Sequence, residues 1–223
     1  MENLIILGAG ATGREIAGVI EDINLRKQLW NVLGFLDDDP AKRGQTVNGL
    51  KVLGPIASAK QHQARFVVGI AVPSPDRFRR RKIVEETGFE RERFATVIHP
   101  SATISRLATV GLGTAILQNV VVNPNAMIGD HVIVQYGASI SHDVIIEDFA
   151  TVAPAAVVCG YVRVCSGAYL GAGSMIRNGT AEKRLTLNEG ALVGIGSVVI
   201  SDVPAGATVV GNPARPVPAT RRR

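Results

Sequence analysis

The amino-acid sequence predicts two joined folds: a small α/β domain over residues 1–98 and a left-handed parallel β-helix over residues 99–223. Three observations support this prediction. Short apolar segments alternate with helix-like segments in the first part, and a glycine-rich turn follows the first of them. In the second part an aliphatic residue recurs at every sixth position, which is typical of a β-helix built from hexapeptides.

The first part has the apolar patterning of buried strands and amphipathic helices. The expected strands are 4–7, 31–36, 65–72 and 94–99, and the expected helices are 13–23 and 76–88. Because strands and helices alternate, the strands should form one small parallel sheet. The first part is therefore expected to be a Rossmann-like domain.

A G-x-G-x-x-G turn joins the first strand to the first helix. Glycines permit a tight turn there, and the start of the helix offers free N–H groups to a phosphate. The second strand ends in carboxylates that could accept hydrogen bonds from a ribose or a base. The expected substrate-binding residues are Gly8, Gly10, Ala11, Thr12, Gly13, Asp37 and Asp38.

Two other interpretations of this turn remain open. One is a redox dinucleotide site, although the domain is short and nothing downstream resembles a hydride-transfer site. The other is that the glycines only close a strand-to-helix turn. A nucleotide bound without redox chemistry is favoured.

The second part repeats with a period of six residues. Two inward positions per repeat, one large and one small, describe a short strand followed by a turn, and three repeats close a triangular coil. Stacked coils lie about 4.8 Å apart with paired backbones. The large slots are Ile104, Val110, Ile116, Val122, Ile128, Val134, Ile140, Ile146, Val152, Val158, Val164, Leu170, Ile176, Leu187, Val193 and Val199.

The repeat is interrupted once, between Ile176 and Leu187. An insertion in a β-helix must leave at a corner, so residues 177–186 are expected to form a protruding loop whose role the sequence does not indicate. The chain then leaves the repeat through residues 202–217.

Composition narrows the functional classes. Only 4% of residues are aromatic while 46% are hydrophobic, which suits a narrow and uniform core. The N-terminus resembles no signal peptide and no apolar run is long enough to span a membrane, so we expect a cytoplasmic protein without membrane insertion. Cys159 and Cys165 should then be reduced thiols, and no metal site is expected.

The net charge of +5 is concentrated in "RFRRRK" (77–82) and the terminal "RRR" (221–223). Apart from Phe78, no aromatic residue is interleaved with these runs, whereas a nucleic-acid surface would carry several, so no nucleic-acid partner is expected. An anionic small substrate fits them as well as a solvated surface does.

Several motifs together resemble a known family. The hexapeptides, "HD" at 142–143, "GAGS" at 171–174 and "VVGNPARPV" at 209–217 are preceded by "GAGATG" and "FLDDD". Nearly the whole chain is similar to bacterial sugar acyltransferases, which include sialic acid O-acetyltransferases and N-acetyltransferases of nucleotide-linked 4-amino sugars. The resemblance implies acetyl-CoA as co-substrate, an obligate homotrimer with acetyl-CoA between neighbouring β-helices, and an N-terminal domain that holds the substrate.

The resemblance also assigns catalytic residues. His142 points away from the core and matches the catalytic base of the family, and Asp143 matches the acidic neighbour that orients the imidazole. Gly160 occupies the same slot one coil later and matches the backbone donor to the thioester oxyanion. We expect a side chain at Gly160 to block the thioester without disturbing the fold. The alternative is that His142 is only an exposed histidine on a turn.

Coenzyme A contacts are carried over in the same way. Relatives often have a histidine at the position of Thr151, so that contact is a departure from the pattern. The other implied cofactor-binding residues are Ala172, Ile195, Pro213 and Arg215. Arg215 has a second interpretation, as a solvated residue of the tail.

The preferred function is an acetyl-CoA-dependent N-acetyltransferase, an acyltransferase of surface glycan synthesis that acts on a UDP- or GDP-linked 4-amino-deoxysugar. Sialic acid O-acetylation is the first alternative. A non-catalytic nucleotide-binding scaffold is the alternative of another class. The glycine turn and Asp37 favour the nucleotide sugar, since a free sugar acid needs no nucleotide cradle.

Overall fold

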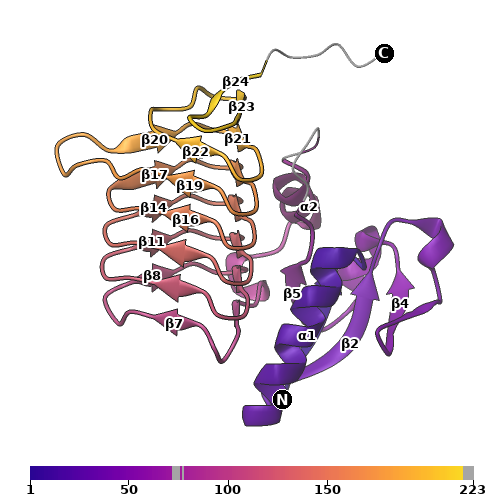
Figure 1. Cartoon of the computed structure of the whole chain (residues 1–223). Coiled ribbons are helices and arrows are strands. Elements are labelled where there is room, and N and C mark those ends of the chain that lie inside the picture. Colours follow the sequence, from indigo (N-terminus) through magenta and orange to yellow (C-terminus); the bar gives the residue numbers. More distant parts are fainter. Residues whose placement is uncertain (72–75, 77, 218–223) are drawn as a thin grey trace.

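A computed structural model describes residues 1–71, 76 and 78–217. Figure 1 shows the N-terminal α/β domain beside a tall stack of short parallel strands, with the C-terminal strands at the far end of the stack. The predicted fold class, a Rossmann-like domain followed by a β-helix, is confirmed. None of the helices in these ranges has the length and apolar character needed to cross a membrane. Residues 72–75 and 77, which include parts of the predicted strand 65–72 and helix 76–88, and the terminal arginines lie outside the described residues.

The N-terminal domain has a five-stranded sheet with the order β3-β4-β2-β1-β5. All neighbours are parallel except the β3–β4 hairpin. The strands are β1 Glu2–Leu7, β2 Trp30–Leu36, β3 Thr46–Val47, β4 Leu50–Gly54 and β5 Arg65–Val68. The helices are α1 Ala11–Arg26, α2 Arg79–Thr87 and the 3-10 turns Pro40–Lys42, Ile56–Gln61 and Arg91–Arg93.

Several element boundaries differ from the sequence-based prediction. Strand β5 ends at Val68, and α2 begins only at Arg79. The predicted strand 94–99 is divided between the two parts: Phe94 forms an isolated parallel bridge with Phe66 of β5, whereas β6 Val97–Ile98 pairs with a β-helix strand. A parallel strand of two residues can join either sheet, and its sequence does not decide which.

Helix α1 packs closely on the sheet because Gly13 has no side chain. A Cβ at Gly13 would lie 1.9 Å from the carbonyl oxygen of Gly8. Gly69 makes the reciprocal approach, since its added Cβ would lie 2.5 Å from Gly13 Cα. Gly13 therefore serves helix–sheet packing.

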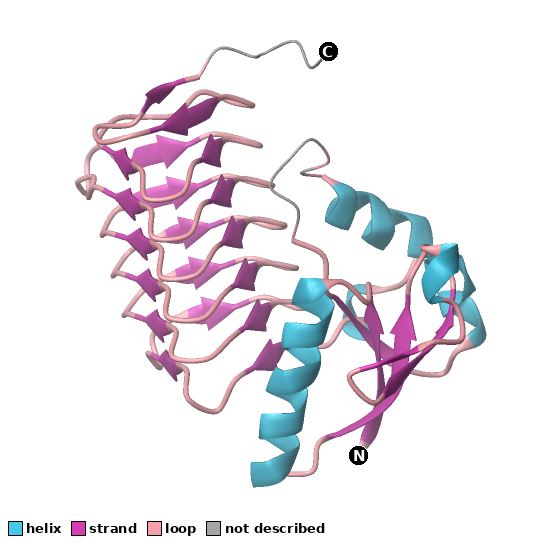
Figure 2. Ribbon diagram, turned by 45° about the vertical axis from the view of Figure 1, so that its right-hand side comes forward, coloured by secondary structure: helices cyan, strands magenta, loops and turns pink. Residues whose placement is uncertain are grey.

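The β-helix strands form three faces that Figure 2 shows as stacked columns. Face 1 has β7 Thr103–Ile104, β10 Val121–Val122, β13 Ser139–Ile140, β16 Val157–Val158, β19 Met175–Ile176 and β22 Val198–Val199. Face 2 has β8 Thr109–Val110, β11 Met127–Ile128, β14 Ile145–Ile146, β17 Val162–Val164 and β20 Leu185–Leu187. Face 3 has β6, β9 Ala115–Ile116, β12 Ile133–Val134, β15 Thr151–Val152, β18 Tyr169–Leu170, β21 Leu192–Val193, β23 Thr208–Val210 and β24 Arg215–Pro216.

The predicted register is confirmed throughout the stack. Every predicted aliphatic slot is the last residue of a strand, and slots one coil apart pair directly, as Val122 does with Ile140. The aliphatic side chains form one continuous core. The repeat also continues beyond its predicted exit, because β23 pairs in parallel with β21 and β24 then folds back on β23.

The two parts share an apolar core at face 3. Ile16 of α1 and Val97 belong to the same buried cluster as Ala115, Leu117 and Ile133 of the β-helix. Glu15 also accepts a hydrogen bond from Gln135 across this junction, at 3.1 Å. The N-terminal domain thus covers the lower half of face 3.

Arg80 of α2 is buried in the junction and is only 5% exposed. Its guanidinium donates hydrogen bonds to the carbonyl oxygens of Ile70, His131, Phe149 and Ala150 and to the hydroxyl of Thr151. Burial lowers the pKa of Arg80 to about 10, so the group remains a cation at neutral pH. Arg80 ties α2 and the end of β5 to two coils of the β-helix.

Candidate active site

His142 and Asp143 lie on the corner between β13 and β14, where face 1 meets face 2. The imidazole Nδ1 is 2.8 Å from Asp143 Oδ2. Because a carboxylate accepts hydrogen bonds, Nδ1 carries the proton and Nε2 is the basic nitrogen. The His142 side chain is 56% exposed, so the amine or hydroxyl of a substrate can reach it.

Asp143 is held as a carboxylate. Its hydrogen bond with His142 lowers its pKa most, and Asn125 and the charges of His142 and Arg184 lower it further against the opposing effect of desolvation. Asn125 Nδ2 donates to Asp143 Oδ1 at 3.2 Å. A carboxylate that stays ionised can orient the imidazole and stabilise the imidazolium formed when Nε2 takes a proton.

Gly160 lies beside the imidazole, one coil further along the same corner. A Cβ on Gly160 would stand 2.6 Å from His142 Cε1 and 2.8 Å from Nε2. No described residue accepts a hydrogen bond from the Gly160 N–H, so the residue beside the imidazole has an open backbone donor. A base and a free backbone donor in this arrangement are what acyl transfer requires.

This geometry adds a second effect to the expected blocking of the thioester, because a side chain at Gly160 would also meet the imidazole of His142. We expect Gly160→Ala to push the imidazole aside and lower kcat by roughly 10- to 100-fold, because misplacing a catalytic group by about 1 Å has effects of this size. The exposed imidazole can move, so the free energy of unfolding should change by less than about 1 kcal/mol. Steady-state kinetics and urea denaturation of the purified variant test both statements. Wild-type kcat in the alanine variant would contradict them.

The other three histidines are placed differently. His131 is buried between Phe94 and Phe149, and burial lowers its pKa to about 4. His99 is buried at the domain junction, where Nε2 lies 2.9 Å from Asp22. His62 ends a 3-10 turn on the N-terminal domain. Only His142 combines exposure, a carboxylate on Nδ1 and an adjacent open N–H among the described residues.

The residues expected to bind coenzyme A gather on another corner, between face 3 and face 1. Ala172 and Ile195 are stacked there, with the Gly196 N–H donating to the Ala172 carbonyl at 2.9 Å. Ile195 is 84% exposed. Pro213 and Arg215 are exposed in the segment that caps this corner, where Ala214 N–H donates to the Val198 carbonyl. One chain therefore carries His142 and these residues on separate edges of the prism.

Thr151 does not join either group, and its assignment to coenzyme A is corrected. Its side chain points from face 3 into the domain junction, and the residue is only 3% exposed. The hydroxyl accepts a hydrogen bond from Arg80 at 3.0 Å. A side chain buried within its own chain is closed to the cofactor.

The glycine turn opens onto a cavity of about 510 Å³ in the N-terminal domain. Gly8, Gly10, Ala11, Thr12, Asp37 and Asp38 line it, as the sequence predicts. Gly13 does not line it and belongs to the helix–sheet contact. Helix α1 starts at Ala11 with no side-chain cap, so its first N–H groups are available to an anion.

Asp37 and Asp38 also organise the cavity wall. Asp37 Oδ2 accepts from the Ala9 N–H at 2.7 Å and from Lys42 Nζ at 3.1 Å. Although burial opposes it, these hydrogen bonds and the one from Asp39 lower the pKa of Asp37. Asp38 accepts from the Ile56 N–H at 2.9 Å. Asp37 thereby fixes the glycine turn.

Two cations, Lys42 and Arg79, also line this cavity and were not among the predicted substrate-binding residues. Arg79 lies within the basic run, whose position after the third strand of the sheet is a signal that could have found it. Tyr161 and Arg184, which lie beside His142 and Asp143, were also missed. In the described ranges no three His, Cys, Asp or Glu side chains are grouped as metal ligands.

Comparisons with known proteins agree with this geometry. The family model of the PglD N-terminal domain matches residues 3–87. The chain is 31% identical over 210 residues to GDP-perosamine N-acetyltransferase of Escherichia coli O157:H7, covering 94% of both chains. The acetyltransferase domain of PglB from Neisseria gonorrhoeae, solved with acetyl coenzyme A, has a TM-score of 0.83 and 29% identity over 97% of this chain and 99% of that chain. A histidine-to-alanine variant of GDP-perosamine N-acetyltransferase from Caulobacter crescentus, solved with CoA and GDP-perosamine, has a TM-score of 0.82 and 27% identity over 97% of both chains.

Proposed function

The chain belongs to the sugar N-acetyltransferase family that includes GDP-perosamine N-acetyltransferase, and we propose that it acetylates the amine of a GDP-linked amino sugar with acetyl-CoA. The observation that carries the chemistry is the open Nε2 of His142, held by Asp143 and placed beside the free N–H of Gly160. GDP is favoured over UDP because two relatives that cover nearly the whole chain are named for GDP-perosamine.

The chemistry follows from these groups. The nitrogen of the substrate amine attacks the thioester carbonyl carbon while His142 Nε2 takes a proton from that amine. The negative charge that develops on the carbonyl oxygen is stabilised by the Gly160 N–H. The carbon–sulfur bond then breaks, and the imidazolium returns the proton to the departing coenzyme A thiolate. Asp143 compensates the imidazolium charge between these steps.

The substrate sites are assigned by charge and position. The GDP moiety occupies the cavity of the glycine turn, where the N-terminus of α1, Lys42 and Arg79 favour its diphosphate. Coenzyme A lies along the corner of Ala172, Ile195, Pro213 and Arg215. The acetyl group must reach His142, which is on a different corner of the same chain.

A threefold assembly resolves this separation. Face 1 lies between the two corners and carries exposed apolar residues, with Val121 39% and Met175 52% exposed. Packing face 1 of three copies around an axis would bring the His142 corner of one copy against the coenzyme A corner of the next. The N-terminal domain covers the lower half of face 3 and so obstructs the same packing there. The homotrimer is thus part of the proposal.

Subunit mixing tests the shared site. His142→Ala and Ile195→Glu homotrimers should each be inactive, the second because it places a charge on the coenzyme A corner. Unfolding and refolding of an equal mixture should restore about a quarter of wild-type activity. A site is intact only where the subunit that supplies His142 carries Ile195→Glu and the subunit that supplies the coenzyme A corner carries His142→Ala. Refolded single variants are the controls. A mixture with no more activity than they have would contradict shared sites.

The function itself is tested by thiol release from acetyl-CoA with a panel of GDP-, UDP- and CMP-linked sugars. We expect the highest kcat/KM with a GDP-linked amino sugar. Activity confined to sialic acid would support the O-acetyltransferase alternative. Nucleotide binding without coenzyme A binding in calorimetry would support a non-catalytic scaffold and overturn the proposal.

A further inference from the structure

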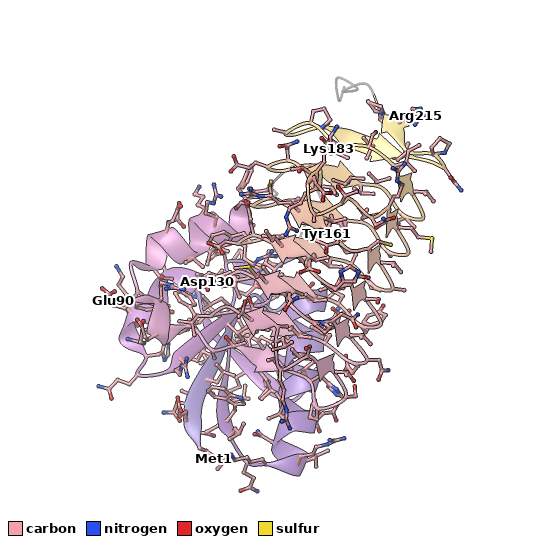
Figure 3. All side chains as sticks on the ribbon, turned by 90° about the vertical axis from the view of Figure 1, so that its left-hand side faces the viewer. Met1, Glu90, Asp130, Tyr161, Lys183 and Arg215 are labelled. Carbon is pink, nitrogen blue, oxygen red and sulfur yellow. The ribbon has the colours of Figure 1, made fainter. Side chains whose placement is uncertain are left out.

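The protruding loop leaves the same corner that carries His142. It joins β19 of face 1 to β20 of face 2, just as the His142 turn joins β13 to β14. Figure 1 shows it projecting from the stack beside β20. In Figure 3 the labelled Lys183 of the loop and Tyr161 of the coil below lie on the side that faces the viewer.

Backbone contacts fix the base of this loop on the coil of Gly160 and Tyr161. Gly179 N–H donates to the Gly160 carbonyl at 3.0 Å, and Leu185 N–H donates to the Tyr161 carbonyl at 3.2 Å. The loop closes on itself through Thr180, whose N–H donates to the Lys183 carbonyl at 2.9 Å. Arg184 therefore follows a tight turn and has a defined starting point.

From there the Arg184 side chain reaches back along the corner to the coil of His142. Its guanidinium lies 5.8 Å from the centroid of the Tyr161 ring. The Tyr161 ring meets the His142 imidazole edge-on, with centroids 5.3 Å apart. Arg184 Nη1 donates a hydrogen bond to the main-chain carbonyl oxygen of Asp143. One loop residue thus contacts Tyr161 and Asp143, the two neighbours of His142.

The hydrogen bond falls on a residue whose backbone needs support. Asp143 has a φ of 57°, in the left-handed region that costs free energy for residues with a side chain. In this conformation the Asp143 carboxylate lies 2.8 Å from His142 Nδ1. A cationic donor on the Asp143 carbonyl stabilises it, and the same positive charge favours the ionised carboxylate.

We propose that Arg184 is a positioning residue for the acetyl transfer: the loop 177–184 holds it so that its guanidinium fixes Asp143 and, through Asp143, the imidazole of His142. The inference rests on the proposed function for its catalytic meaning. It assigns a role to the insertion, which supplies a cation that contacts Asp143. Arginine suits this task because its guanidinium donates in a fixed plane and remains charged.

The kinetic test compares Arg184→Gln, Arg184→Lys and the control Lys183→Gln. The control removes the same charge from the neighbouring exposed loop residue. We expect Arg184→Gln to lower kcat about tenfold or more while KM for both substrates changes less than about twofold, since orientation is lost and binding is not. Arg184→Lys should recover part of kcat, and Lys183→Gln should match wild type. Equal kcat in Arg184→Gln and Lys183→Gln would overturn the proposal.

A second measurement needs no turnover. The chain has four histidines, so imidazole nitrogen-15 NMR of the labelled protein can be assigned with His142→Gln. We expect His142 to show the Nδ1-protonated form in wild type and in Lys183→Gln, and a tautomer mixture in Arg184→Gln. An unchanged His142 spectrum in Arg184→Gln would contradict the positioning role. If wild type acetylates no acceptor, the proposed function fails while this spectrum still decides the role of Arg184.

Discussion

Replacing His142 with alanine should lower kcat by about 10² to 10⁴, the usual contribution of a general base. The affinity for acetyl-CoA should stay close to wild type, because the coenzyme A corner carries none of the lost contacts. The acidic limb of the pH–rate profile should also disappear with the imidazole, since no other described histidine is both exposed and paired with a carboxylate. Steady-state kinetics and calorimetry with acetyl-CoA measure these effects.

Asp143→Asn is the matched companion of that variant. An amide keeps the size of the side chain but removes the charge that orients Nδ1–H and stabilises the imidazolium. Its kcat should therefore fall between those of wild type and His142→Ala. If His142→Ala retains near wild-type kcat on a confirmed acceptor, the base is another group and the proposed chemistry is wrong.

Arg80→Met should lower the free energy of unfolding by about 3 kcal/mol or more. The substitution keeps a long apolar side chain but leaves the buried or part-buried carbonyl oxygens of Ile70, His131 and Phe149 without their charged donor, and each orphaned acceptor costs about 1–3 kcal/mol. Urea denaturation measures the change. The affinity of the glycine-turn cavity for a nucleotide should also fall, since Ile70 and Arg79 line this cavity and Arg79 directly precedes Arg80.

Lys82→Gln is the control on the same helix. Among the described residues Lys82 forms an ion pair with Glu86 alone, on the surface and with 73% of its side chain exposed, so its loss should change stability by less than about 0.5 kcal/mol. If Arg80→Met changed the free energy of unfolding by as little, water or a neighbour would be replacing the guanidinium. Arg80 would then not stabilise the junction as stated.

The β-helix could be predicted strand by strand because its period is unambiguous. Each coil repeats the demand for an inward aliphatic residue, so an error in one repeat is corrected by the next. The N-terminal domain offers no such redundancy. The β3–β4 hairpin was missed although its Asn48-Gly49 turn, with both residues at positive φ, is a strong hairpin signal. The predicted strand 94–99 was assigned to one sheet although Phe94 bridges to β5 and β6 joins the β-helix, because the two residues of β6 carry too little pattern.

The site was predictable where its residues are close in sequence or one coil apart. His142 and Asp143 are adjacent, and Gly160 follows from the repeat. The roles of Arg80 and Arg184 could not be predicted from the sequence. Both donate to main-chain carbonyl oxygens, which every residue has, so no residue type marks the partner. Thr151 was misassigned because its partner, the Arg80 side chain, comes from a helix of the other domain.

The most direct test of the central claim is the mass of the product formed from acetyl-CoA and GDP-perosamine. We expect a gain of one acetyl group on the amine, coupled one-to-one with coenzyme A release and slowed by the His142→Ala change. The matching GDP-sugar with a hydroxyl in place of the amine should remain unmodified. Absence of acetylated product from every GDP-, UDP- and CMP-linked amino sugar, or equal acetylation of the hydroxyl analogue, would contradict it.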